Sequence, residues 1–190
     1  MTKNNFKDET NFSSSTSGGA VSISISTPFG VMHACATEKG ICLLEFENRK
    51  NINLQFKKLA DSLNAVIVEG ESIYFEQLKS ELENYFQGGK SEFTVPLDLV
   101  GTDFQKKVWS ELLKIPYGKT ISYKQLAERV GDVKAVRAVA NANGMNKIAL
   151  IIPCHRVIGS DGSLTGYAGG LDRKRHLLAL EGAKMDLFSK

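Results

Sequence analysis

Cys154, His155 and Arg156 stand side by side, directly after the short apolar run 148–153, "IALIIP". A histidine or a cation beside a cysteine lowers the pKa of the thiol and raises the fraction of reactive thiolate. The stretch could therefore be a nucleophile with its base. It could equally be part of a metal site. Free cysteines are also among the most often buried residues, so a purely structural thiol is the third interpretation.

The metal interpretation lacks ligands. Structural zinc sites usually combine two pairs of closely spaced ligands, and no second pair accompanies Cys154 and His155. His33, Cys35 and Cys42 form only a partial set, which two strands and a hairpin explain better. We expect no metal and no cofactor, and we expect Cys35 and Cys42 to be buried structural thiols.

A histidine that acts on a neighbouring cysteine needs further groups. A bridging water can relay the proton, and a carboxylate should orient the far ring nitrogen. Glu181 is a candidate for that carboxylate, at the end of the last predicted helix. Position alone does not decide between this relay and a structural thiol.

Composition places the chain among ordinary soluble proteins. It has 190 residues, of which 42% are hydrophobic and 24% charged, so one or two small domains are expected. We find no signal peptide and no apolar run long enough to span a bilayer. Three cysteines, an odd number, argue against a disulfide framework, and we expect a cytoplasmic protein.

Charge divides the chain into two halves. Residues 1–100 hold 9 basic and 13 acidic residues, a net charge of −4, whereas residues 101–190 hold 15 and 8, a net charge of +7. A basic half can bind a polyanion such as DNA by displacing counterions, although the same charges can form an ordinary solvated surface.

Residues 20–94 have the pattern of an α/β domain, after a polar segment, 1–19, that predicts a disordered tail. Alternation and turn residues predict strands over 21–26, 31–37 and 40–47, with Glu38–Gly40 as a hairpin turn. Weaker periodicity suggests a helix over 51–62, and a clearer amphipathic helix over 71–86 ends at Gly88–Gly89.

Residues 95–190 predict a second, mainly helical domain beyond a glycine-containing linker, 87–101. Thr102 with Gln105 and Ser122 with Gln125 fit capping boxes at two helix starts. The predicted helices 123–130 and 135–144, joined by a tight turn at Gly131, match a helix-turn-helix or simple helix packing. We further expect a strand over 148–153, a glycine-rich loop over 159–174, and a last helix with Asp172 as N-cap and Gly182 as its stop.

Three stretches together carry a resemblance to a known family. "SYKQLA" (122–127), "IPCHRVIG" (152–159) and "GYAGGLDRKRHLLALEGA" (166–183) resemble the O6-alkylguanine-DNA alkyltransferases. The resemblance is strong over 95–183 and loose before that. It implies an α/β protein of two domains: an RNase H-like N-terminal domain, and a mostly helical C-terminal domain with a winged-helix-like helix-turn-helix.

The resemblance also implies an activity. Such a protein moves the alkyl group from O6-alkylguanine, and from O4-alkylthymine, in double-stranded DNA to its own cysteine, irreversibly and once. The relay maps onto Cys154, His155 and Glu181, with a water between thiol and imidazole. Transfer from an unactivated alkyl carbon needs a strong, soft nucleophile such as a thiolate, and the thioether product is stable.

The remaining roles come from the same resemblance. Tyr123 neutralises the guanine leaving group near N3 and helps to turn the nucleotide out of the stack, and Asn146 is a hinge. Arg137 fills the gap while its helix, with the small residues Ala135 and Ala138, enters the minor groove. The substrate pocket would be formed by Tyr167, with backbone groups of Cys154, Val157 and Ala168.

Two loop residues differ from some relatives. Ala168 cannot supply a side-chain hydrogen bond to guanine, and Gly169 leaves room, so we expect bulky adducts such as benzyl to be accepted. We expect a monomer. A DNA-binding module without chemistry, and a cysteine hydrolase that regenerates its thiol, are the competing classes.

Overall fold

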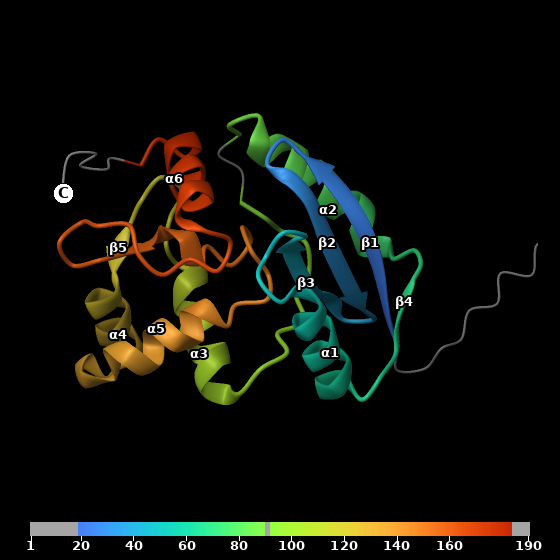
Figure 1. The fold of residues 1–190 in the computed structure, drawn as a ribbon, viewed down its shortest axis with the longest axis horizontal. Helices are drawn as coiled ribbons and strands as arrows, with labels where there is room; N and C mark the ends of the chain where they lie inside the picture. Colours follow the sequence, from blue (N-terminus) through green and yellow to red (C-terminus); the bar gives the residue numbers. More distant parts are fainter. Residues whose placement is uncertain (1–18, 90–91, 184–190) are drawn as a thin grey trace, which may run out of the picture.

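The computed structural model describes residues 19–89 and 92–183, so the predicted tail, 1–19, lies almost wholly outside the described residues. Figure 1 shows the sheet with two helices against it in one part of the molecule and a second group of helices beside that part. The boundary that we placed between residues 94 and 95 stays a prediction.

The N-terminal part is a four-stranded sheet in the order β3-β2-β1-β4. The three predicted strands are confirmed as β1 (Ala20–Thr27), β2 (Gly30–Thr37) and β3 (Gly40–Phe46), which pair antiparallel. β4 (Ile67–Glu69) pairs parallel with β1 and was not predicted, because three residues are too few to show an alternating pattern.

Two helices cover the opposite faces of this sheet, because successive strand residues point to alternate sides. The predicted helices are confirmed as α1 (Ile52–Leu63) and α2 (Ile73–Phe86). Leu59 of α1 packs on Cys35, Cys42 and Leu43, whereas α2 packs on the other face with Phe75, Leu78 and Leu82. Burial holds the pKa of both Cys35 and Cys42 far above the usual range, so these thiols are inert and structural, as expected.

The C-terminal part is built from short helices with the predicted start signals. Both capping boxes are present, at the start of α3 (Asp103–Leu113) and of α4 (Tyr123–Val130). Gly131, with φ of +98°, ends α4, and the short helix η1 (Val133–Ala135) leads into α5 (Val136–Gly144). A parallel pair of two-residue strands, β5 (Ile121–Ser122) and β6 (Val157–Ile158), joins α4 to the segment after Cys154.

Two predictions for the C-terminal part are wrong. Residues 148–153 do not form a strand: only Ile148 makes a bridge, to Leu44, and the chain then turns, with Leu150 at φ of +70°. The run is apolar because the turn itself is buried, and periodicity cannot distinguish that from a buried strand. The N-cap of α6 (Leu171–Leu180) is Gly170, at φ of +90°, so Asp172 lies inside the first turn and pairs with Arg175.

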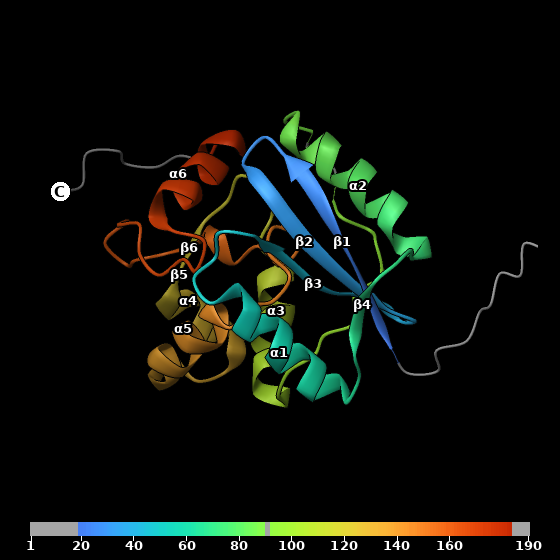
Figure 2. The same ribbon diagram turned by 45° about the vertical axis from the view of Figure 1, so that its right-hand side comes forward.

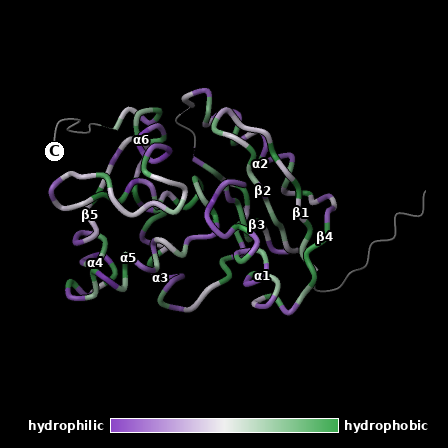
Figure 3. The backbone as a smooth tube through the Cα atoms, viewed as in Figure 1, coloured by the Kyte–Doolittle hydropathy of each residue, from purple (hydrophilic) through white to green (hydrophobic). Residues whose placement is uncertain are grey.

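A single apolar core runs through both parts of the chain. In Figure 3 hydrophobic residues follow the strands, whereas hydrophilic residues lie along the outer turns of α1 and α4. The linker segment runs alongside β3 in space: the Ile41 amide donates to the Pro96 carbonyl at 2.8 Å. Figure 2 shows α6 beside the C-terminal end of α2, and so the last described helix meets the N-terminal part.

Candidate active site

A buried turn, 146–153, presents Cys154 to the centre of the molecule. The edge of β3 holds this turn, because the Leu44 amide donates to Lys147 at 2.9 Å and the Leu44 carbonyl accepts from Ala149 at 2.7 Å. Asn146 spans the turn from within: its side-chain oxygen accepts from Ile148 at 2.9 Å and its Nδ2 donates to the Ile152 carbonyl at 2.8 Å. The turn therefore fixes the residue that follows it.

Cys154 begins the short helix η2 (Cys154–Arg156) and is buried. Asn146 Nδ2 also donates to Cys154 Sγ, at 3.2 Å, so the predicted hinge residue touches the thiol directly. Burial raises the thiol pKa above its usual value, and the Asn146 hydrogen bond only partly opposes this. The resting group is therefore a neutral thiol, which needs a base before it can act as a nucleophile.

His155 is fully buried and faces Glu181 at the end of α6, with 2.7 Å between Nε2 and Oε1. An ionised carboxylate only accepts hydrogen bonds, so Nε2 carries the ring hydrogen and Nδ1 carries the lone pair. Burial lowers the pKa of His155, against the opposing pull of Glu181, so the ring is a neutral base near pH 7.

Glu181 receives five hydrogen bonds. Its donors are His155 Nε2, the Tyr85 hydroxyl, the Gly118 amide, and Arg156 Nε and Nη2. Burial alone would raise the Glu181 pKa, but His155 and Arg156 outweigh it and lower the pKa to about 2. The sequence did not point to Tyr85, whose helix showed only core periodicity, nor to a partner for Arg156.

A small cavity lies against Cys154. Its water-accessible volume is about 10 Å³, which is room for about one water molecule. Among the described residues, three buried polar side-chain atoms have no hydrogen-bond partner: Asn143 Oδ1, His155 Nδ1 and the Tyr167 hydroxyl oxygen. Asn143 and Tyr167 line the cavity with Cys154, and the Tyr167 ring lies 6.5 Å from that of His155. The Asn143 and Tyr167 atoms are therefore candidate partners for a ligand in this cavity.

Tyr123 lies at the first residue of α4, under the glycine-rich loop. Its hydroxyl donates to the Gly166 carbonyl at 3.0 Å. Burial and the nearby Cys154 raise the Tyr123 pKa to about 12, so at neutral pH the hydroxyl is a proton donor. Ala168 and Gly169 also line the cavity, but the space that a side chain on Gly169 would use is taken, since a Cβ there would lie 2.8 Å from the Tyr167 ring.

Lys174 of α6 is a buried cation that lies against this loop, and nothing in the charged run 172–176 distinguishes it from its more exposed neighbours. Its Nζ donates to the carbonyls of Val157, at 2.5 Å, and Thr165, at 2.6 Å. Burial lowers the pKa of Lys174 to about 8. The carbonyl of Val157, predicted to face the substrate, is therefore also bonded to a cation.

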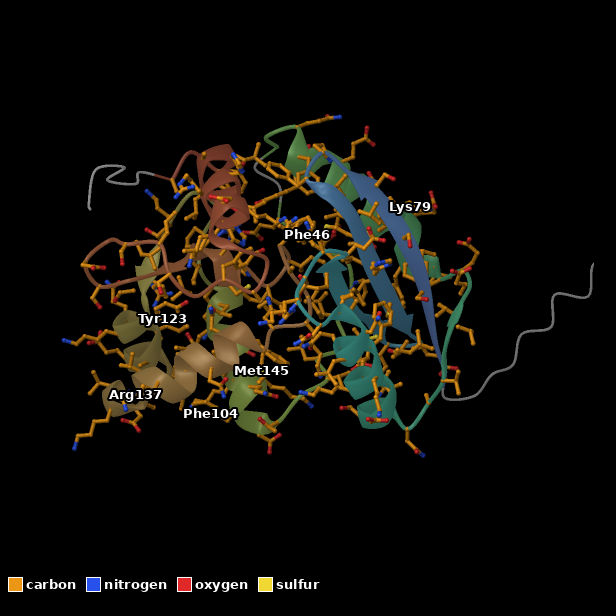
Figure 4. All side chains as sticks on the ribbon, in the orientation of Figure 1. Phe46, Lys79, Phe104, Tyr123, Arg137 and Met145 are labelled. Atoms are coloured by element: carbon orange, nitrogen blue, oxygen red, sulfur yellow. The ribbon has the colours of Figure 1, made fainter. Side chains whose placement is uncertain are left out.

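The predicted DNA-contacting residues lie apart from the relay. Arg137 and Ala138 are exposed on α5, and Ala135, just before it, is half-buried. Figure 4 shows Arg137 on the same side of the molecule as Tyr123. The inner side of α5 is anchored by Trp109, whose Nε1 donates to the Ala142 carbonyl at 2.9 Å. Of the three residues of the predicted relay, His155 and Glu181 are in direct contact, and Cys154 precedes His155 in η2.

Neither a metal cluster nor a membrane span is found in residues 19–89 and 92–183. No group of three or more His, Cys, Asp or Glu side chains there could hold a metal ion. No helix in the same ranges is long and apolar enough to cross a membrane.

A helix-turn-helix together with a buried cysteine and a hydrogen-bonded His155–Glu181 pair is typical of a DNA-binding protein that carries a candidate nucleophile. Comparison with protein families agrees: the 6-O-methylguanine DNA methyltransferase DNA-binding domain matches residues 103–183, and the ribonuclease-like domain of the same family matches 21–99. The chain belongs to the 6-O-methylguanine DNA methyltransferase family. The family and the two-domain α/β fold expected from the sequence are confirmed.

Individual relatives agree with the family. A Methanosarcina barkeri protein named methylated-DNA–protein-cysteine methyltransferase is 46% identical over 158 residues, 83% of this chain and 94% of the relative. The crystal structure of Mycobacterium tuberculosis O6-methylguanine methyltransferase is 40% identical, with a TM-score of 0.72 over 88% of this chain and 97% of that one. Mycobacterium tuberculosis OGT in complex with DNA is 41% identical, with a TM-score of 0.73 over 85% and 92%.

Proposed function

We propose that Cys154 is the alkyl acceptor of this methylated-DNA–protein-cysteine methyltransferase, a repair protein that takes alkyl groups from O6-alkylguanine and O4-alkylthymine in DNA. The observation that carries the proposal is the arrangement behind the thiol. Asn146 donates to Sγ of Cys154, and the next residue, His155, is buried against Glu181 with its Nδ1 left without a hydrogen-bond partner.

The chemistry begins with a proton. Because the thiol pKa is raised, His155 Nδ1 must take the Sγ proton, and we propose that one water bridges the two residues. The thiolate then attacks the alkyl carbon in line, a carbon–sulfur bond forms, and the carbon–oxygen bond breaks with its electron pair on the guanine. The Tyr123 hydroxyl, a proton donor at neutral pH, neutralises that charge near N3.

The product limits each molecule to one reaction. Because the thioether product is stable, the alkyl carbon is not returned to water and one chain repairs one lesion. We propose that the chain acts as a monomer. Glu181 remains ionised throughout, since its pKa is about 2, and it stabilises the imidazolium that forms on His155.

Delivery of the base requires it to leave the duplex. A cavity with room for about one water cannot admit guanine unless the loop that carries Tyr167 and Ala168 moves, and Tyr123 must release the Gly166 carbonyl to reach the base. We propose that α5, with Ala135 and Ala138, enters the minor groove and that Arg137 replaces the flipped nucleotide in the stack. Tyr167, Val157 and Ala168 then enclose the alkylated guanine.

The test follows the alkyl group. A duplex carrying O6-methylguanine with a labelled methyl group is incubated with the wild type, Cys154→Ala and Cys35→Ala. We expect one equivalent of label on the wild type and on Cys35→Ala, whose thiol is structural, and none on Cys154→Ala. Label that stays on the DNA would leave only a DNA-binding module, and label released as methanol with turnover would indicate a hydrolase.

A further inference from the structure

Tyr85 brings the N-terminal part of the chain into contact with Glu181, the carboxylate behind His155 in the proposed relay. It lies in the last turn of α2, whose C-terminal end approaches α6 in both Figure 1 and Figure 2. The residue is 1% exposed, and its ring packs on those of Phe86, Phe93 and Tyr117. Its hydroxyl donates to Glu181 Oε1 at 2.8 Å, 96 residues away in sequence.

This hydroxyl shares its acceptor atom with His155. Oε1 of Glu181 accepts from His155 Nε2 at 2.7 Å, from Tyr85 at 2.8 Å, and from Arg156 Nη2 at 3.0 Å. The other oxygen, Oε2, accepts from Arg156 Nε at 2.8 Å and from the Gly118 amide at 3.1 Å. A carboxylate offers about four lone-pair positions, so Glu181 is saturated and its orientation is fixed.

Tyr85 can act only as a donor. Burial and the charge of Glu181 raise its pKa far above the usual value, so the hydroxyl keeps its hydrogen at every pH at which the protein works. A hydroxyl that cannot ionise and faces only Glu181 cannot take a proton from His155. Its effect on the relay must therefore pass through the carboxylate.

We propose that Tyr85 is a positioning residue of the alkyl-transfer site: it holds the carboxylate of Glu181 toward His155 and takes part of the negative charge that would otherwise favour the imidazolium. This inference rests on the function proposed above, and it gives the N-terminal domain a part in the reaction. The hydrogen bond from His155 to Glu181 must be strong enough to orient the ring. The negative charge that Glu181 presents to the ring must also be weak enough to leave Nδ1 unprotonated at neutral pH.

The consequence is a change in pH dependence. Without the Tyr85 hydroxyl, more of the Oε1 charge falls on His155 Nε2–H, the imidazolium is stabilised, and the ring keeps its second proton to higher pH. When the solution is acidified, His155 would then become protonated, and so stop acting as a base, at a higher pH than in the wild type. The charged or titratable groups around His155 and Glu181 that can shape this titration are Cys154, Arg156, Lys174, Tyr117, Tyr167 and Tyr85.

The first experiment compares Tyr85→Phe with the wild type and with Tyr74→Phe. Tyr74 lies on the same helix, but its hydroxyl donates to the Glu38 carbonyl, outside the site. The single-turnover rate of methyl transfer is measured from about pH 5 to 9 at saturating duplex, together with duplex affinity. We expect the acid midpoint of Tyr85→Phe to rise by about half a pH unit or more, with unchanged affinity. Tyr74→Phe should follow the wild type.

A second measurement reads His155 without any transfer. The ¹⁵N resonances of its ring, titrated in the DNA-free protein, should show a midpoint at higher pH in Tyr85→Phe than in the wild type. The inference about Tyr85 is overturned if this midpoint and the rate profile are unchanged, or if the rate falls equally at every pH. The proposed function fails separately, when the wild type itself takes no label from DNA.

Discussion

At the scale of single residues, Lys174 is the least expected part of the site. Its side chain is fully buried and ties the carbonyl of Val157, just after the nucleophile segment, to that of Thr165 in the glycine-rich loop. The charge lies near the ring of Tyr123, 6.0 Å from its centroid, and it partly opposes the rise that burial causes in the pKa of Cys154. One cation therefore holds the loop and favours the thiolate.

Lys174→Met should slow methyl transfer and destabilise the fold. The buried Val157 carbonyl and the partly buried Thr165 carbonyl lose their donor, which we expect to cost about 2 kcal/mol of unfolding free energy at pH 7. Burial lowers the pKa of Lys174 from its ordinary 10.5 to about 8 in the folded protein. Between these two pH values the unfolded chain binds more protons than the folded one, so Lys174 makes the wild type more stable as the pH rises. The variant should lack this increase.

Urea unfolding at pH 7 and pH 10 measures both effects, with Lys106→Met, an exposed lysine of α3, as control. The difference in stability between wild type and Lys174→Met should widen at pH 10. Parallel stabilities at the two pH values would show that the lysine is not buried as described.

At the scale of elements, local signals predicted what local interactions determine. The boxes at Thr102 and Ser122 place α3 and α4 because capping hydrogen bonds join residues three apart. The strand prediction for 148–153 is wrong because the bridging partner of this segment, Leu44, is about a hundred residues distant and leaves no trace in the local pattern. β4 was missed for the same reason, since only its pairing with β1 defines it.

The glycine-rich loop limits the size of the O6-alkyl group that the pocket can accept. Ala168 adds little volume, and Tyr167 fills the space beside Gly169, so displacement of one ring opens the pocket. We expect O6-benzylguanine to react as well as O6-methylguanine in the same duplex. Gly169→Ala should lower the benzyl rate more than the methyl rate, because the new Cβ would press on Tyr167, whereas Ser160→Ala, exposed in the same loop, should change neither. A wild-type benzyl rate at background would refute this expectation.

At the scale of the whole molecule, the N-terminal part contributes to the site through residues that no motif marks. Motif resemblance predicted Cys154, His155 and Glu181. Neither Tyr85 nor Arg49 could be predicted, because each acts across the boundary between the two parts. Arg173 makes the reverse contact: it reaches from α6 over the ring of Phe46, near the centre of Figure 4, at 4.0 Å from the centroid.

Arg49, which makes one of these links, also belongs to a buried ion pair within the N-terminal part. Arg49 pairs with Glu45, and the two side chains are only 6% and 4% exposed. Arg49 also donates to the carbonyls of Asn146 and Gly144, each at 3.0 Å, and so holds the end of α5 and the residue that touches Cys154 Sγ. Burial raises the pKa of Glu45, and the charge of Arg49 opposes that rise.

Arg49→Met should therefore destabilise the protein by about 3 kcal/mol, because it leaves a buried carboxylate without its cation. The double variant Glu45→Met, Arg49→Met removes both charges and should recover much of that loss. Lys79→Met breaks an exposed pair with Glu76 on the outer side of α2, labelled in Figure 4, and should change stability little. Urea unfolding of the four proteins measures the interaction. A double variant no more stable than Arg49→Met would show that the unpaired Glu45 carboxylate is not the source of the loss, which would then lie with the Asn146 and Gly144 carbonyls that lose Arg49.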